Sequence, residues 1–182
     1  TSFVVLTPIG VGAAAGLWSS VATEWKAGPD TVALVTGMLS AIVTALSCLF
    51  GGFISDKFGH WIAFFGSGAL LALLTLFMGF TSFIPATFTG GVLLYAFIYG
   101  INFASFSAVV LHAIGKGLAS TKYALLSSLA NIPTTYMTAL DGWMHDYFNI
   151  KFMLWGETII GFTFILICLI IMQYYKLHKV SL

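Results

Sequence analysis

The feature that most constrains this chain is a succession of long apolar stretches, each separated from the next by a short polar break. A helix that crosses the roughly 30 Å hydrocarbon core of a bilayer needs about 20 apolar residues. Six stretches approach or reach that length: about 1 to 22, 31 to 54, 61 to 80, 90 to 114, 122 to 143 and 152 to 174. They lack the apolar–polar alternation of strands. The sequence therefore predicts an all-α membrane protein with six transmembrane helices in a single bundle over 1–182.

The composition excludes several classes of protein. Of the 182 residues, 59% are hydrophobic and 7% are charged, whereas about a quarter of a soluble domain is charged. A soluble enzyme and a disordered chain are both excluded. The net charge is +1 and the sequence contains no arginine, so we expect no nucleic-acid partner. Cys48 and Cys168 lie inside apolar stretches without a metal-ligand spacing, and we expect neither a metal nor a cofactor.

The lysines are unevenly divided between the two sides that six spans define. One side has five of them: Lys57, Lys116, Lys122, Lys176 and Lys179. The opposite loops have only Lys26 and Lys151. The positive-inside rule then predicts that both termini of this segment are cytoplasmic. We expect the membrane to be an inner, bacterial-type membrane. Because an apolar stretch starts at once, without a charged flank, we expect a longer chain that was cut just before or inside a membrane helix.

Two of the polar breaks share a pattern. Gly52-Phe-Ile-Ser-Asp56-Lys57-Phe58-Gly59 aligns with Gly142-Trp-Met-His-Asp146-Tyr-Phe148-Asn149. The two copies close the second and fifth stretches, on opposite sides of the membrane, which predicts two inverted three-helix repeats. In the first copy we expect Gly52 to allow close helix approach, Gly59 to adopt a positive φ, and Asp56 to cap or oppose a helix N-terminus. A tight, capped loop without a transport role is the alternative.

The segment from Gly52 to Gly59 resembles the loop signature Gly-x-x-x-Asp-(Arg/Lys)-x-Gly of the major facilitator superfamily. The match departs at His60 and Trp61, where that family usually has basic residues. The stretch 120–131, followed by Asp141-Gly142-Trp143, resembles the eleventh helix of the muropeptide permease and acetyl-coenzyme A transporter branch. The resemblance covers essentially the whole chain. It implies the carboxy-terminal six-helix half of a permease that works by alternating access, usually with proton coupling, and whose partner is a second six-helix half or a second copy.

Polar residues recur at helical spacing in three of the stretches. The expected substrate pathway comprises Tyr95, Tyr99, Asn102, Ser105, Ser127, Asn131, Thr134 and Thr138. A third set, Thr36, Ser40, Thr44 and Ser47, fits helix packing better, because serine and threonine often bond their own backbone or mediate helix contacts. Pro133 predicts a kink in the fifth stretch. The third and sixth stretches are nearly uniformly apolar, and the resemblance implies that they are peripheral.

Few ionisable groups lie within the apolar stretches. Asp141, near the outer end of the fifth, and Glu157, at the start of the sixth, are candidates for carrying a coupling proton, since low dielectric favours a neutral carboxyl. The competing interpretation, which we favour at this point, is that both are hydrated residues near the membrane surface.

Other classes of function remain open. A six-helix structural or oligomerising module needs no transport chemistry. An intramembrane protease needs a nucleophile loop with a partner histidine or a His-Glu-x-x-His motif, and the sequence has neither. A channel needs a carbonyl filter or a ring of charges, which is not evident. We therefore expect a transporter of a small or amphiphilic solute, without enzymatic activity.

Overall fold

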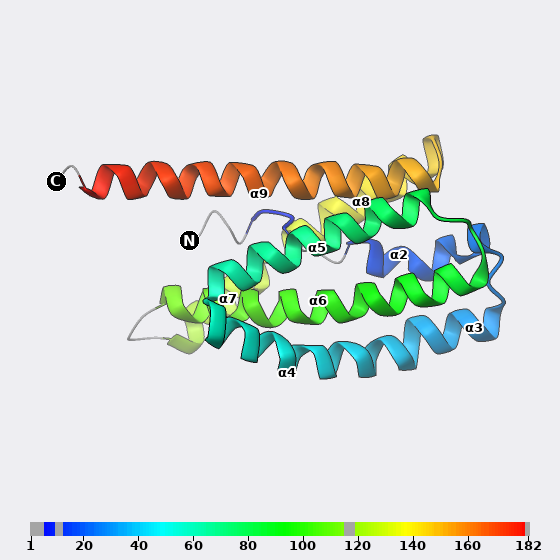
Figure 1. Cartoon of the computed structure of the whole chain (residues 1–182), viewed down its shortest axis with the longest axis horizontal. Coiled ribbons are helices and arrows are strands. Elements are labelled where there is room, and N and C mark those ends of the chain that lie inside the picture. Colours follow the sequence, from blue (N-terminus) through cyan, green and yellow to red (C-terminus); the bar gives the residue numbers. More distant parts are fainter. Residues whose placement is uncertain (1–5, 10–12, 115–118, 181–182) are drawn as a thin grey trace.

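A computed structural model describes residues 6–9, 13–114 and 119–180 of the chain. Every regular element in these ranges is a helix, and successive helical segments alternate in direction along one long axis (Figure 1). The elements are α2 (Ala13–Val21), η1 (Ala22–Trp25), α3 (Pro29–Ala33), η2 (Leu34–Leu39), α4 (Ser40–Phe58), α5 (His60–Phe80), α6 (Pro85–Ile114), α7 (Ala119–Leu129), α8 (Asn131–Tyr147) and α9 (Ile150–Val180).

Four helical segments in the described part of the chain are long and apolar enough to cross a membrane. They are Pro29–Phe58, which joins α3, the π-helical turn η2 and α4, followed by His60–Phe80, Pro85–His112 and Ile150–Tyr174. These segments match the second, third, fourth and sixth apolar stretches of the sequence. The prediction of an all-α chain with long apolar helices is confirmed over the described residues, and such helices are compatible with a membrane protein.

The first predicted span is not a long helix where the structure describes it. Leu6 to Ile9 form a turn, and the nine-residue α2 follows. Expecting helix over residues 6–9 was wrong because Pro8 has no backbone N–H and disfavours helical backbone at the residue before it. The remainder of the predicted span, 1–5 and 10–12, lies outside the described residues.

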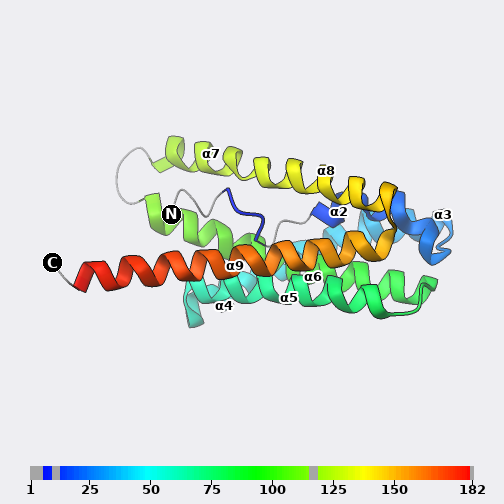
Figure 2. The same ribbon diagram turned by 90° about the horizontal axis from the view of Figure 1, so that it is seen from above.

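The fifth predicted span is two helices with a turn at Ala130 between them. α7 has 11 residues and α8 has 17, so neither alone reaches the length of a membrane span. Pro133 explains the break, since it offers no N–H to the carbonyl of Leu129 four residues earlier. The interruption lies where Pro133 predicted a kink, and Ala130 keeps a right-handed helical backbone, with φ −64° and ψ −17°. The two helices still follow one another along the same side of the molecule (Figure 2).

Of the five polar breaks between the apolar stretches, four separate helices as predicted. The remaining break, at 115–117, falls outside the described residues. Gly59 adopts a φ of 93° between α4 and α5, as its place in the loop signature predicted. Asn149 starts α9, because its side-chain Oδ1 accepts hydrogen bonds from the backbone N–H groups of Lys151 and Phe152 at 2.9 and 3.1 Å.

Two details predicted for the first loop copy were wrong. No side chain caps the start of α5, and Asp56 lies exposed in the last turn of α4; the capping role was wrong, and the alternative that Asp56 opposes a helix N-terminus stays a prediction. Gly52 faces open space, whereas its neighbour Gly51 is the residue at a close helix contact: a Cβ there would lie 2.8 Å from the Cα of Ile101. One residue of shift along a helix turns a side chain by about 100°, so the sequence pattern placed the glycine correctly in the chain and on the wrong face.

The third apolar stretch is central rather than peripheral. α5 packs against both α6 and α9, and 56% of its most apolar window is buried, compared with 11% for Pro29–Phe58. Small residues on α5, including Ala63, Ser67 and Ala72, are buried and allow both neighbours to approach. The hydroxyls of Thr75 and Thr158 lie 3.0 Å apart across the α5–α9 contact. Peripheral placement was therefore the wrong expectation for this stretch.

The two copies of the repeated pattern end α4 and α8 at opposite ends of the molecule (Figure 1). The end with the α4–α5 turn also holds the start of α7 and the C-terminal end of α9, and so carries Lys57, Lys122 and the backbone of Lys176 and Lys179. The other end carries Lys26 and Lys151. Lys116 lies outside the described residues.

Candidate functional site

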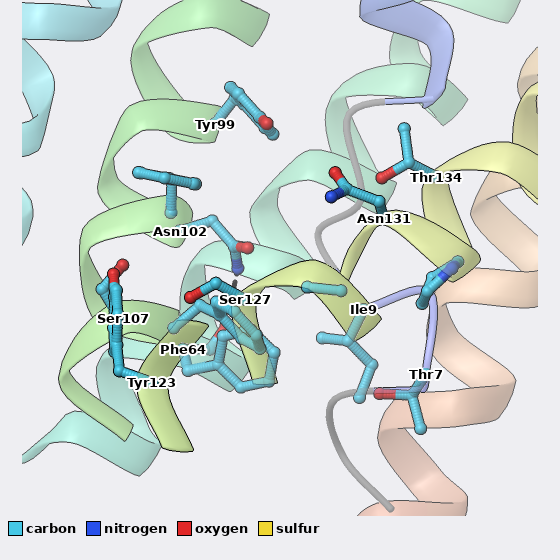
Figure 3. Close-up of a pocket in the computed structure, with 14 residues that line it drawn as sticks. Thr7, Ile9, Phe64, Tyr99, Asn102, Ser107, Tyr123, Ser127, Asn131 and Thr134 are labelled. Carbon is cyan, nitrogen blue, oxygen red and sulfur yellow. Dashed lines mark hydrogen bonds between the residues drawn. The ribbon is translucent and has the colours of Figure 1, made fainter. Parts of the chain in front are cut away.

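A cavity of about 300 Å³ lies between α6 and the broken pair α7–α8. Helix α5 and the Leu6–Ile9 segment complete its walls, and Figure 3 shows the lining side chains. From α6 come Tyr99, Asn102, Phe103, Phe106 and Ser107. The remaining walls contribute Thr7, Ile9, Phe64, Tyr123, Ser127, Ala130, Asn131, Pro133 and Thr134.

The helix break lies on the wall of this cavity. Ala130, the turn residue, and Pro133, which causes the turn, both line it. Ser127 is at the end of α7 and Asn131 at the start of α8. Polar groups from both sides of the interruption therefore face one cavity.

Asn102 is fixed in orientation by two hydrogen bonds. Its Nδ2 donates to the carbonyl oxygen of Phe64 at 3.0 Å and to the Oγ of Ser67 at 2.9 Å, both on α5. Because the Phe64 carbonyl can only accept, the amide nitrogen must face α5. The amide oxygen is then turned to the other side, where the side chain lines the cavity (Figure 3). Only 3% of Asn102 is exposed.

The cavity has a buried floor and an exposed rim. Thr7, Ile9, Phe64 and Asn102 are buried, whereas Asn131 and Thr134 are exposed. The Leu6–Ile9 segment is held against α8 by a hydrogen bond of 3.2 Å from the Tyr136 hydroxyl to the Leu6 carbonyl.

Five of the eight residues predicted for a substrate pathway line this cavity: Tyr99, Asn102, Ser127, Asn131 and Thr134. The other three have different surroundings. Ser105 accepts a 3.0 Å hydrogen bond from Ser55 at the α4–α6 contact. The Thr138 hydroxyl donates to the backbone oxygen of Thr134, and Tyr95 donates to Glu157.

Sequence reasoning missed four of the five aromatic side chains in the lining: Phe64, Phe103, Phe106 and Tyr123. Phe103 and Phe106 lie on the same face of α6 as Tyr99 and Asn102, and their spacing of three and four residues could have revealed them. Phe64, Thr7 and Ile9 carried no such signal, because they come from segments where no pathway was expected.

A second polar cluster lies apart from the cavity lining, where α6, α8 and α9 meet. The Tyr95 hydroxyl donates to Glu157 Oε1 at 2.6 Å, and Asp141 is close enough to act electrostatically on Glu157. Asp141 is 0% exposed and Glu157 is 8% exposed. Among the described residues, neither Asp141 oxygen nor Glu157 Oε2 has a hydrogen-bond partner. Hydration of these two carboxyls was the wrong expectation, because helix packing encloses both.

The charged residues of the repeated loop pattern, Asp56, Lys57 and Asp146, are exposed and do not line the cavity. Lys57 Nζ is 5.4 Å from the centroid of the Phe58 ring. Asp146 Oδ1 lies 3.2 Å from His145 Nδ1, and His145 Nε2 is 3.8 Å from Glu24 Oε1. Gly142 faces open space. No group of three or more metal-ligating side chains occurs in the part of the chain that was described.

Comparisons with protein-family models, curated proteins and solved structures find no match for this chain.

Proposed function

We propose that this chain is half of a secondary active transporter that moves a small or amphiphilic solute across a membrane by alternating access. The observation that carries the proposal is the cavity beside the α7–α8 break, where side-chain hydroxyls and amides face a space between apolar helices. Polar groups at membrane depth are retained chiefly where they line a pathway or pair with one another. A discontinuous helix beside them is how many transporters build a solute site.

The family we propose is the major facilitator superfamily, on the resemblance of the Gly52–Gly59 loop. Two observations support an inverted-repeat bundle of six passes: successive segments alternate in direction, and the two copies of the loop pattern end α4 and α8 at opposite ends (Figure 1). A second six-helix half, or a second copy, would complete the pathway. The lysine-rich end would face the cytoplasm of an inner membrane.

The Tyr95–Glu157–Asp141 cluster is our candidate for proton coupling. Two carboxyls that share one apolar enclosure cannot both be charged at low cost. Gain or loss of one proton there would change the packing free energy of α6, α8 and α9 together, and α6 and α8 also form the cavity walls. Solute and proton could in this way bias the same helices.

The test is solute-driven proton movement in proteoliposomes that contain the protein and an entrapped pH-sensitive dye. A panel of neutral, anionic and cationic sugars and amino acids is added in turn to the outside. We expect at least one solute to acidify the lumen. Asp141→Asn should abolish this signal, while Asp30→Asn, the same change at an exposed position on α3, should leave it intact.

Two results would contradict the proposal. Unchanged proton-driven uptake by Asp141→Asn would remove the coupling role from that carboxyl. Absence of flux for every solute, in the chain and in its complex with a second half, would favour the six-helix structural module instead.

A further inference from the structure

We propose that the cavity is built for an uncharged solute that carries hydroxyl groups and an apolar ring face, of which a glycoside is the simplest member, with Asn102 as its fixed hydrogen-bond acceptor. The inference deepens the proposed transport function and rests on it for its biological meaning. Binding itself can be measured without transport, so the two ideas can fail separately.

The described side chains that line the cavity are all uncharged. No Asp, Glu, Lys, Arg or His is among the described residues that line the cavity. An ion that entered would lose hydration without gaining a countercharge, which is strongly unfavourable in an apolar enclosure. The buried carboxyls Asp141 and Glu157 do not line it. The lining therefore selects for a neutral solute.

The side-chain amide of Asn102 has a fixed orientation. Its amide nitrogen is committed to Phe64 and Ser67 on α5, and the amide oxygen is turned toward the cavity from a side chain that is 97% buried (3% exposed). An amide oxygen that is open to the cavity can accept a hydrogen bond from a bound molecule. A solute that presents an O–H or N–H group at this depth would meet that oxygen without any rearrangement of the protein.

The rim of the cavity carries hydroxyl and amide side chains. In the described part of the chain, the side chains of Ser127, Asn131 and Thr134 make no hydrogen bond to other protein groups, and they lie on the wall opposite Asn102 (Figure 3). Hydroxyls both donate and accept, and an amide offers one group of each kind. Groups of this mixed character are matched best by a solute with several hydroxyls, because each hydroxyl can also serve as donor or acceptor.

Aromatic side chains form another part of the cavity lining. Phe64 and Phe106 have ring centroids 5.8 Å apart, and Tyr99 and Phe103 have centroids 6.4 Å apart. The electron-rich faces of such rings attract the polarised C–H groups of a sugar ring. A solute that was polar on every side would gain nothing from these rings, and a purely apolar one would leave Asn102 unmatched.

The experiment compares two probes that differ in one group, p-nitrophenyl β-D-glucoside and p-nitrophenyl β-D-glucuronide. Equilibrium dialysis against the purified chain, followed by nitrophenyl absorbance, gives both affinities. The detergent must have no sugar headgroup, since such a headgroup would compete. We expect the neutral glucoside to bind at least tenfold more tightly than the anionic glucuronide.

Variants connect this preference to the cavity. Asn102→Leu should weaken glucoside binding at least tenfold, and Asn131→Leu should weaken it at least fivefold. Asn131 is exposed, so its variant remains informative if loss of the Asn102 anchor impairs folding. Ser127→Ala and Ser128→Ala form a matched pair at the end of α7: only Ser127 lines the cavity, and only its loss should reduce binding.

Equal affinity for the two probes, no binding of either, or unchanged binding in both asparagine variants would overturn the proposal. If octyl glucoside competes more tightly than methyl glucoside, the natural ligand is the headgroup of a glycolipid. If the two compete equally, the natural ligand is a free sugar. Either result supports the binding chemistry. Binding without any uptake would overturn the transport function and leave the site standing.

Discussion

Helix α6 carries serines on two faces whose surroundings differ: Ser105 faces α4, and Ser107 lines the cavity. Toward α4, the Ser55 hydroxyl donates to Ser105 at 3.0 Å, and Thr44 donates to the carbonyl of Ala96 at 3.3 Å. The helices touch closely here, because a Cβ on Gly100 would lie 2.6 Å from the carbonyl oxygen of Thr44. This face is dry packing, in which each of these hydroxyls has a protein partner.

Toward α7 and α8, α6 presents Tyr99, Asn102 and Ser107 to the cavity. Aromatic rings line the cavity on this side, and the Asn102 amide oxygen faces the open space. The difference teaches that the kind of polar residue does not decide its role. The decisive property is whether a neighbouring helix already satisfies its hydrogen-bonding groups.

The largest effect should come from filling the close contact. Gly100→Ala places a methyl group against the Ser47 hydroxyl and the Thr44 backbone, and overpacking of this kind costs about 3 kcal/mol. Thermal unfolding in detergent, followed by circular dichroism, measures the loss. Gly90→Ala is the matched control on the same helix: nothing lies within 4 Å of its new Cβ, so it should be neutral or gain up to about 1 kcal/mol of helix propensity. Equal melting temperatures for the two variants would show that α4 and α6 are not in close contact.

A smaller effect separates the two kinds of serine on α6. Ser105→Ala removes the acceptor of the buried Ser55 hydroxyl and should destabilise the protein by about 1–2 kcal/mol. Removing both hydroxyls should recover part of that loss. Ser107→Ala, two residues further along the helix and on the cavity wall, should leave the unfolding temperature nearly unchanged while weakening glucoside binding. If the two variants exchanged these phenotypes, our assignment of the faces would be wrong.

The helix break offers the next test of the comparison. Pro133→Ala supplies the N–H that the Leu129 carbonyl lacks, and an added backbone hydrogen bond stabilises by about 1 kcal/mol. We expect a higher unfolding temperature and several-fold slower solute uptake, because α7 and α8 would then form one continuous wall. Pro85→Ala is the control, since Pro85 occupies the first residue of α6, where no intrahelical N–H is needed. Faster uptake in Pro133→Ala would contradict a role for the break.

Helix positions could be predicted from the sequence where one physical property decides them. Long apolar stretches predicted the four membrane-length helices, and Gly59 marked a turn through its backbone freedom. The failures arose where packing decides. Whether Gly51 or Gly52 contacts α6 depends on helix rotation, and the depth of α5 depends on which neighbours it meets. Neither property leaves a mark in the apolar pattern.

The candidate site was predictable only in part, for the same reason. Helical spacing identified Asn102, Ser127 and Asn131, because polar residues in an apolar helix are conspicuous. It could not separate them from Ser105, which has identical spacing and a protein partner. Proximity to span ends suggested that Asp141 is hydrated, and only the packing of neighbouring helices buries it completely.

The smallest effect is expected at Thr36, in the π-helical turn η2 that precedes α4. The Thr36 hydroxyl donates to the Val32 carbonyl in its own helix at 2.8 Å, and Thr36 does not line the cavity. Thr36→Val keeps the shape and removes only this local bond, so stability should change by no more than about 0.5 kcal/mol. Glucoside affinity should stay within twofold of the original value. Thr134→Val makes the same substitution on the cavity rim and should weaken binding severalfold. A large loss of binding in Thr36→Val would place this stripe in the solute pathway, and a silent Thr134→Val would remove the rim from it.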